Sequence, residues 1–191
     1  MFLLALAVLA VHTAVAKPFY IPSGSMLPGL LVGDRLIVSK YPYGYSYLSP
    51  SLNVLPKMEG RLFGSLPERG DIVVLKSPIA QDDWIKRVIG LPRDTVQMKD
   101  GRLWLNGVAV PKLKLADTVM KVTPNSDCAT MIDAQYRVIT PDGTTECHLP
   151  TYRETLPNGV AHSALDTFDQ DSMRLGGRMN LDTTKVYTVP D

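Results

Sequence analysis

Residues 84–90 read WIKRVIG and residues 71–76 read DIVVLK, and these two short apolar runs decide the fold class. Each is rich in Val, Ile or Leu over a few residues, which is typical of a β-strand. Similar runs lie further out along the chain at 34–40, 94–98 and 102–106. The 15 prolines and 14 glycines suit many short strands joined by tight turns. We therefore predict an all-β or mainly β protein.

Two turn sequences indicate hairpins within this pattern. KDG at 99–101 lies between two of the predicted strands, and PDG at 141–143 lies between RVIT and TTECHL. Residues 41–69 show little periodicity, so we interpret them as a long surface loop with room for a short hairpin. The block from 99 to 180 is more polar, and we predict that it forms an inserted subdomain.

The chain begins with an apolar segment, since residues 2–16 (FLLALAVLAVHTAVA) carry no formal charge. A helix of about 15 residues spans roughly 23 Å, so a membrane span would need snorkelling by Lys17, a thinner bilayer or upstream residues. A cleaved signal peptide is a second interpretation, because AVA at 14–16 suits the cleavage rule. A buried core helix is a third. The first two place the rest of the chain outside the cytoplasm.

Charge and cysteine content narrow the function classes. The net charge is +1 and the basic residues do not cluster, so no nucleic-acid partner is expected. Cys128 and Cys147 suit an oxidising compartment and are predicted to form a disulfide, with two separate buried thiols as the alternative. His148 adjoins Cys147, but no CxxC or HxxxH pair accompanies them, so zinc is not expected.

The histidines offer no convincing catalytic triad, and the sequence lacks a GxSxG nucleophile elbow. His12 lies in the apolar segment. His162 and Ser163 are followed by Asp166, but neighbours in sequence do not face one another in triad geometry. The paired carboxylates in the sequence are equally weak evidence for acid–base chemistry. A serine activated by a lysine is the remaining arrangement.

A lysine acts as a base only when its amine is neutral. The free amine has a pKa of about 10.4, which burial can lower by up to about 3–5 units. A basic lysine is therefore expected in an apolar strand, with its amine in the core or in a dry cleft. Lys86 in WIKRVIG fits this expectation, with Trp84, Ile85 and Val88 around it. The ordinary alternative is a strand-face lysine that extends into water.

A second stretch, IPSGSMLPG at 21–29, supplies a candidate nucleophile. Ser25 lies between a glycine and a methionine, so a substrate backbone has room to approach. The Ser23 hydroxyl and the Ser25 backbone N–H are candidate donors to the oxyanion of a tetrahedral intermediate. Pro22 and Pro28 stiffen the loop. Taken alone, the stretch is also compatible with a simple turn.

Three motifs in fixed order make the pattern specific: IPSGSMLPGLLVGDRLIV (21–38), RGDIVVLKSP (69–78) and DWIKRVIGLPRD (83–94). Together they resemble bacterial type I signal peptidase (leader peptidase), a serine peptidase with a Ser/Lys dyad. YRETLPNGV (152–160) and KVYTVPD (185–191) are also similar to that family. The resemblance implies a catalytic β domain at 17–98 with 181–191, a β-rich insertion at 99–180, and an apolar membrane helix at 1–16.

The resemblance also implies residue roles. Ser25 matches the nucleophile, Ser23 and the Ser25 N–H match the oxyanion hole, and Lys86 matches the general base. The shallow apolar pockets of the family match Ile21, Pro22, Met26, Leu30 and Ile85. The implied activity is removal of signal peptides from exported preproteins at the outer face of the bacterial inner membrane. The implied partners are those signal peptides and the lipid bilayer, and no metal or cofactor is expected.

The chain departs from the family pattern at several points. Gly29 stands where the family usually has threonine, and Arg93 stands where it usually has glycine. If position 93 needs a positive φ, arginine there is strained by roughly 1–2 kcal/mol. A GDNR motif and a further serine that orients the lysine are expected after Asp191, and the apolar anchor looks short. We therefore expect a fragment, shortened at its C-terminus and at its N-terminus.

Several alternatives remain open at this stage. Another Ser/Lys peptidase, such as a self-cleaving repressor, would carry a DNA-binding head where this chain has an apolar segment. A secreted β-rich binding module, cut after Ala16, would leave Ser25 in an ordinary turn. A third alternative is an inactive, truncated homologue that still binds signal peptides.

Overall fold

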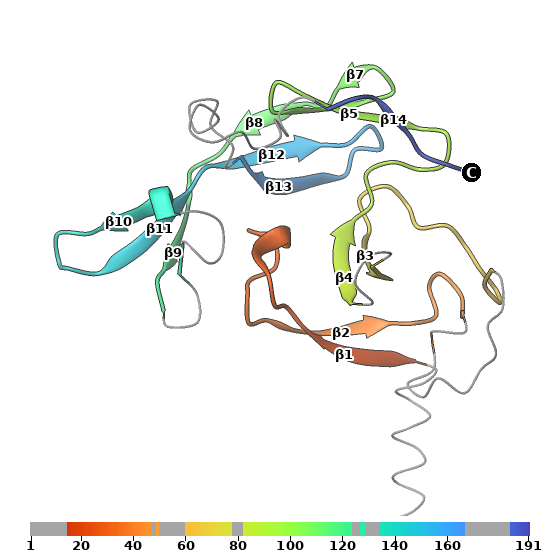
Figure 1. The fold of residues 1–191 in the computed structure, drawn as a ribbon, viewed down its shortest axis with the longest axis horizontal. Helices are drawn as coiled ribbons and strands as arrows, with labels where there is room; N and C mark the ends of the chain where they lie inside the picture. Colours follow the sequence, from red (N-terminus) through yellow and green to blue (C-terminus); the bar gives the residue numbers. More distant parts are fainter. Residues whose placement is uncertain are drawn as a thin grey trace, which may run out of the picture. The chain divides into compact units, whose positions relative to one another are not determined.

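The structure is a computed structural model that describes residues 15–46, 49, 60–77, 82–123, 127–128, 134–166 and 184–191 (Figure 1). The described chain is mainly β, as predicted, with two short 3₁₀ helices, η1 (Gly24–Met26) and η2 (Ala134–Tyr136). It divides into two compact units. The first comprises Met1–Ile21 with Gly33–Pro67, and the second comprises Pro22–Val32 with Glu68–Asp191.

The first unit is built on an antiparallel pair of strands, β1 (Ala16–Tyr20) and β2 (Arg35–Ser39). The ladder continues beyond the strands, because the Ile21 amide donates to the Asp34 carbonyl at 2.9 Å. In the predicted loop at 41–69, Tyr45 and Leu62 form an isolated antiparallel bridge. The expected surface loop therefore contains local pairing, while its residues 47–48 and 50–59 lie outside the described residues.

The predicted apolar helix at 1–16 falls on residues 1–14, which lie outside the described residues, and on two residues that are described. Val15 is in a turn and Ala16 begins β1, so the boundary predicted after residue 16 needs correction. The reason is strand pairing: Ala16 lies opposite Ser39, and the Lys40 amide donates to the Val15 carbonyl at 2.9 Å. Across the described residues, we find no helix with the length and apolar character that a membrane span requires.

In the second unit, the predicted strands are present with displaced ends. They are β3 (Ile72–Lys76), β4 (Asp83–Arg87), β5 (Thr95–Lys99) and β6 (Arg102–Leu105). The largest displacement is at β4, which ends at Arg87 rather than at the predicted Gly90. The predicted KDG turn joins β5 to β6, with Lys99 opposite Arg102 and positive φ at both Asp100 and Gly101. These two φ values suit the tight two-residue turn of a hairpin.

The remaining strands complete three further sheets. One has the order β14–β5–β6–β7, another β13–β12–β8, and the third β10–β11–β9. The PDG turn joins β10 to β11, as predicted, with Ile139 opposite Thr145. The bounds of the strands not yet given are β7 (Val108–Ala109), β8 (Lys112–Lys114), β9 (Thr118–Lys121), β10 (Arg137–Ile139), β11 (Thr145–Leu149), β12 (Thr151–Thr155), β13 (Ala161–Leu165) and β14 (Tyr187–Thr188).

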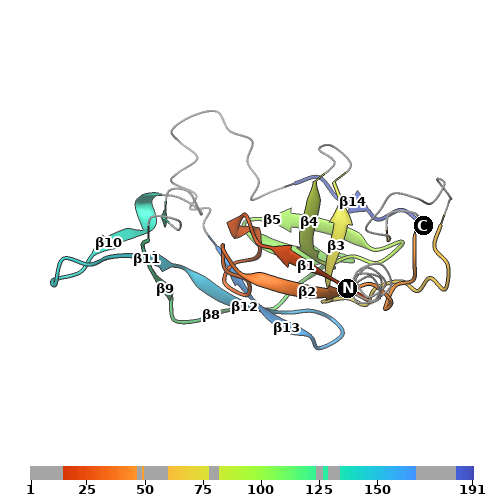
Figure 2. The same ribbon diagram turned by 90° about the horizontal axis from the view of Figure 1, so that it is seen from below.

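Two of these sheets share a continuous ribbon. β8 leads into β9 and β11 leads into β12, so β9, β10 and β11 extend from the end of the β8–β12–β13 sheet (Figures 1 and 2). Thr151 lies at the junction and is buried, and its hydroxyl hydrogen bonds with the Thr118 hydroxyl at 2.7 Å and the Leu149 carbonyl at 2.9 Å. These bonds satisfy a buried polar group at the bend.

Two apolar clusters form the core of this unit. The larger contains four buried residues and partly buried neighbours from β5 and the segment after β4: Leu103, Leu105, Val110 and Leu156, with Ile89, Val96 and Met98. The smaller surrounds a disulfide between Cys128 and Cys147, whose Cα atoms are 5.6 Å apart. The disulfide and the buried Leu149 therefore anchor the extension formed by β9, β10 and β11, which we call the ribbon end. This small sheet buries little apolar surface of its own.

Arg93 adopts the backbone conformation that the family's glycine suggests, with φ of 72°. Its amide donates to the Val189 carbonyl at 2.9 Å, and its guanidinium makes an exposed ion pair with Asp191. The turn that carries Arg93 is therefore paired with the chain around β14. A side chain with a Cβ is strained in this region, whereas glycine is not.

We expect Arg93→Gly to be more stable than Arg93→Ala by about 1 kcal/mol, since both lose the exposed ion pair and only glycine relieves the strain. Urea denaturation of both variants measures the difference. The matched control is Arg153, exposed in β12. There the order should reverse, with alanine better by about 0.5–1 kcal/mol. The same order at both positions would contradict the strain at Arg93.

Candidate functional site

The serine loop is a short, ordered excursion within Pro22–Val32. η1 covers Gly24–Met26, and the Leu27 amide donates to the Gly24 carbonyl at 3.0 Å. Leu27 is buried and fixes the loop at its end, while Ser25 remains exposed. Ser23 precedes the helix in an extended conformation, and its exposed hydroxyl makes no capping hydrogen bond to η1. Two serine hydroxyls are therefore presented at the surface of a fixed turn.

Gly29 does not require glycine for steric reasons. A Cβ added there would meet only the Met26 carbonyl oxygen, at the ordinary contact distance of 3.5 Å. The threonine that the family usually has at this position would therefore find room for its Cβ. Glycine at position 29 gives the unfolded chain more backbone freedom than threonine would, and this freedom is lost when the loop folds.

Lys86 is presented by the antiparallel hairpin of β3 and β4. It lies opposite Val73, while Trp84 lies opposite Leu75 on the same face. The Lys86 amine is 5.9 Å from the centroid of the Trp84 ring, so its stem extends along an apolar surface. We expected a lysine in the core or a dry cleft, but Lys86 is only half-buried. The reason is that it lies on the open face of the hairpin, where Trp84 is itself 36% exposed.

The structure brings the two predicted side chains together. Lys86 Nζ lies 2.6 Å from Ser25 Oγ, although the two residues are 61 positions apart in the chain. Both belong to the second unit. A distance of this size allows direct proton transfer between a hydroxyl and an amine, which typically needs about 2.6–3.2 Å. The arrangement can therefore activate a serine hydroxyl without a histidine.

The residues predicted to contact a substrate differ in exposure. Pro22 is exposed, while Met26, Leu30 and Ile85 are half-buried. Ile21 is only 2% exposed and belongs to the first unit. Their role in substrate binding stays a prediction.

The histidine alternative gains no support from the structure. His162 Nε2 lies 3.4 Å from Glu154 Oε2, across the β12–β13 pair. Ser163 follows His162 in the same strand and so projects from the opposite face. For metals, no group of three or more His, Cys, Asp or Glu side chains in the described parts of the chain is arranged to hold an ion.

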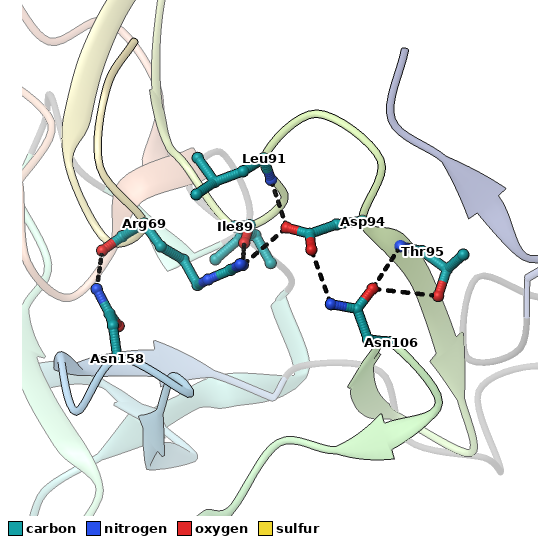
Figure 3. Close-up of polar contacts among 7 residues, drawn as sticks. All are labelled: Arg69, Ile89, Leu91, Asp94, Thr95, Asn106 and Asn158. Carbon is teal, nitrogen blue, oxygen red and sulfur yellow. Dashed lines mark hydrogen bonds and ion pairs between the residues drawn. The ribbon is translucent and has the colours of Figure 1, made fainter. Parts of the chain in front are cut away.

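A second polar cluster lies beyond the end of β4, centred on Asp94 (Figure 3). One carboxylate oxygen accepts from the Leu91 amide at 2.6 Å and from Arg69 Nη1 at 2.8 Å. The other accepts from Asn106 Nδ2 at 2.7 Å. Arg69 also donates to the Ile89 carbonyl at 3.1 Å. The cluster therefore ties the segment before β3 to the turn that follows β4.

The electrostatics of this cluster favour the carboxylate. The Leu91 amide and then the Asn106 side chain hold the pKa of Asp94 below its ordinary value, and the Arg69 guanidinium adds to this, while burial opposes it. The Arg69 and Asp94 side chains are 14% and 11% exposed, so water screens their ion pair little. Asn106 Oδ1 in turn accepts from the Thr95 amide at 2.8 Å.

Sequence reasoning missed Asn106 and Asn158 as members of this cluster. Asn158 Nδ2 donates to the Arg69 carbonyl at 2.7 Å, from the turn between β12 and β13 (Figure 3). Each is a single polar residue in a turn beside glycine, as NG at 106–107 and at 158–159. The NG dipeptides indicated only that the chain turns at these points, and they gave no information about the distant partners Asp94 and Arg69.

Comparison with known proteins points to the same family that the sequence motifs resemble. A family model described as signal peptidase, peptidase S26, matches residues 1–159. Signal peptidase I of Rickettsia akari (strain Hartford) is 38% identical over 109 residues, covering 56% of this chain and 41% of the relative. Signal peptidase I of Rickettsia bellii (strain OSU 85-389) is 36% identical over 108 residues, covering 56% and 37%. The matched part is about two fifths of the length of these relatives.

We expect Asp94→Asn to lower the free energy of unfolding by about 2–4 kcal/mol at pH 7, because it leaves Arg69 without its buried partner. The pKa of the folded carboxyl lies below the unfolded value of about 3.9, so its contribution is present above about pH 4. It is lost as the pH falls through the folded pKa. Urea denaturation of parent and variant at several pH values from 7 to 3 measures this difference.

Asp117→Asn is the matched control for Asp94→Asn. Asp117 makes an exposed ion pair with Lys114, with the two side chains 42% and 49% exposed, so we expect a loss of no more than about 1 kcal/mol. A parent–variant difference for Asp94→Asn that is the same at pH 3 as at pH 7 would argue against a charged Asp94 as the centre of the cluster.

Proposed function

Since the chain belongs to the signal peptidase, peptidase S26, family, we propose that it is a serine endopeptidase that removes signal peptides from exported preproteins with a Ser25/Lys86 dyad. The observation that supports this most directly is the 2.6 Å distance between Lys86 Nζ and Ser25 Oγ. It joins two motifs that were selected independently, one for a nucleophile and one for a base. The 38% identity to signal peptidase I of Rickettsia akari over 109 residues also supports the proposal.

The proposed mechanism is acyl transfer in two steps. The neutral amine of Lys86 accepts the Ser25 proton as Oγ bonds to the scissile carbonyl carbon. The peptide C–N bond then breaks, Lys86 returns the proton to the leaving amine, and an ester with Ser25 remains. In the second step Lys86 takes a proton from a water molecule as its oxygen bonds to the ester carbonyl carbon. The bond between that carbon and Ser25 Oγ then breaks, Lys86 returns the proton to Oγ, and the signal peptide leaves with a new carboxyl end. Each step needs the amine within hydrogen-bond distance of the reacting oxygen.

The oxyanion of each tetrahedral intermediate needs donors that are already in place. We propose the Ser23 hydroxyl and the Ser25 backbone N–H for this role. Ser23 is exposed next to η1, and its hydroxyl makes no capping hydrogen bond to that helix, which supports this role. One such donor typically contributes about 3 kcal/mol to the lowering of the barrier.

The proposed substrate is held in shallow apolar pockets that accept small residues at the first and third positions before the cut. Pro22, Met26, Leu30 and Ile85 surround the dyad in sequence and are exposed or half-buried, which supports this assignment. Ile21 completes the predicted set, although its side chain is buried.

We further propose that the protein acts at the lipid bilayer, at the outer face of a bacterial inner membrane. The apolar residues 2–16 support this, as does an apolar surface on the first unit. There, Ile37 is 81% exposed and Tyr20 is 58% exposed on the face of the β1–β2 sheet that also carries Pro18. A bilayer would cover such a face, and the substrates are anchored in the same membrane. Nothing in the charge pattern favours nucleic acid.

We expect Lys86→Arg and Ser25→Ala each to lower the rate of preprotein cleavage by about 10³-fold or more, because arginine stays protonated and alanine has no nucleophile. Ser23→Ala should lower kcat by about 10²–10³-fold and leave KM close to the parent value. Cleavage of a preprotein with alanine at the first and third positions before the cut measures all three rates.

Lys114→Arg is the control for the lysine variant, because Lys114 is exposed in β8 and pairs only with groups outside the dyad in the described structure. It should cleave at the parent rate. Retained cleavage by Lys86→Arg would reject the lysine as the base. A parent chain that binds signal peptides without cleaving them would instead support the inactive-homologue alternative.

A further inference from the structure

We propose that the turn at residues 156–160, between β12 and β13, is a positioning element for Lys86, and that Asn158 and Val160 are its contact residues. The inference rests on the proposed function of Lys86 as the base. It adds a part of the chain that lies about 70 residues from the lysine in sequence and contacts the backbone at Arg69.

The hairpin that carries Lys86 needs support from outside. Within the described residues, β3 and β4 pair only with each other, and an isolated two-stranded hairpin is at best marginally stable in water. Lys86 lies toward the end of β4, close to the open end of the hairpin. Whatever fixes this open end therefore fixes the lysine.

Arg69 and Gly70 form one side of the open end, and the Gly70 backbone is hydrogen-bonded to the segment that carries Lys86. The Gly70 amide donates to the Val88 carbonyl at 2.8 Å, and Arg87 Nη1 donates to the Gly70 carbonyl at 2.7 Å. Both partners lie within two residues of Lys86. A displacement of Gly70 would therefore be passed directly to β4.

The turn at 156–160 contacts this same backbone at two points. Asn158 Nδ2 donates to the Arg69 carbonyl at 2.7 Å (Figure 3). Val160 packs against Gly70 so closely that a Cβ on Gly70 would lie 2.6 Å from Val160 Cγ1. Gly70 also has φ of 101°, a conformation that side chains rarely adopt. The glycine thus permits both the chain direction before β3 and the close approach of the turn.

The turn itself is held in place by the core. Leu156 is 2% exposed and belongs to the larger apolar cluster, which Ile89 from the segment after β4 also contacts. The Leu156 amide donates to the Val160 carbonyl, and the Gly159 amide donates to the Leu156 carbonyl, both at 2.9 Å. Asn158 Oδ1 accepts from the Val160 amide at 3.4 Å. A closed turn on a buried leucine can resist displacement of the backbone that it contacts.

Asn158→Asp isolates the contact with Arg69. Aspartate keeps an oxygen that can accept from the Val160 amide, but it has no donor for the Arg69 carbonyl. Asn158→Ala removes both bonds, and Val160→Ala opens space beside Gly70. Since a misplacement of about 1 Å can cost up to about 100-fold in rate, we expect Asn158→Asp to lower kcat about 10-fold with KM within about 2-fold.

The second readout does not depend on activity. Partial labelling with an amine-reactive reagent, followed by peptide mass spectrometry, gives the reaction rate of each lysine. We expect Lys86 to react about 3-fold faster or more in Asn158→Asp and in Val160→Ala, because a looser open end exposes its amine more often. Lys99 and Lys121 in the same digests are internal references and should react at the parent rate. Equal acceleration at all three lysines would mean general unfolding and would overturn the proposal.

Val119→Ala is the matched control, because Val119 is an exposed strand valine in β9, within the ribbon end of the unit. It should leave both kcat and Lys86 labelling unchanged. Unchanged Lys86 labelling in Asn158→Asp and Val160→Ala would overturn the positioning role, whatever the activity. If the parent chain cleaves no preprotein, the proposed peptidase function fails, whereas the labelling rates still decide whether the turn positions Lys86.

Discussion

The structure of the site depends on one contact, between a hydroxyl on a short loop and an amine on a two-stranded hairpin. Ser25 and Lys86 meet at 2.6 Å from elements that have little stability of their own. η1 is three residues long and buries none of them, so Leu27 has to anchor the loop. β4 has only β3 beside it in the described sheet pattern. The geometry therefore depends on what holds these two elements from outside.

The Asp94 cluster is the main answer for the hairpin. Both oxygens of a buried carboxylate are occupied by donors, and those donors come from the segment before β3, the turn after β4 and the β6–β7 turn. Hydrogen bonds to a charged group are stronger than neutral ones, and a buried carboxylate left without them would be costly. Residues of RGD (69–71) and GLPRD (90–94) therefore hold the hairpin in place, whereas WIK (84–86) contains the proposed general base. The two motifs at 69–78 and 83–94, which resemble a peptidase family, therefore contain both residues that hold the hairpin and the residue proposed as the base.

The strands could be predicted from the sequence because they depend on local pattern, and local pattern also singled out the two residues of the proposed dyad. Runs of β-branched residues gave strands within a few residues of their observed ends, and two turn sequences gave the right hairpins. Ser25 and Lys86 were found from residue type and surroundings. The partners of Asp94 could not be found in this way, since Asn106 and Asn158 have no periodicity and act over long sequence separations. The exposure of Lys86 was also missed, because apolar neighbours in sequence do not reveal how many strands flank a hairpin.

The packing of the second unit bears on the predicted division into a catalytic domain and an inserted subdomain. The predicted boundary at residue 99 passes through the larger apolar cluster, which joins Ile89 and Val96 on one side to Leu103 and Leu156 on the other. Two segments that share one core cannot shift relative to each other without opening it, and interiors packed at crystal-like density resist such shifts. Substitutions in the β12–β13 turn can therefore act on the lysine through the core as well as through Arg69. Among the described residues, the ribbon end with its disulfide packs in a separate cluster from the one that Ile89 contacts.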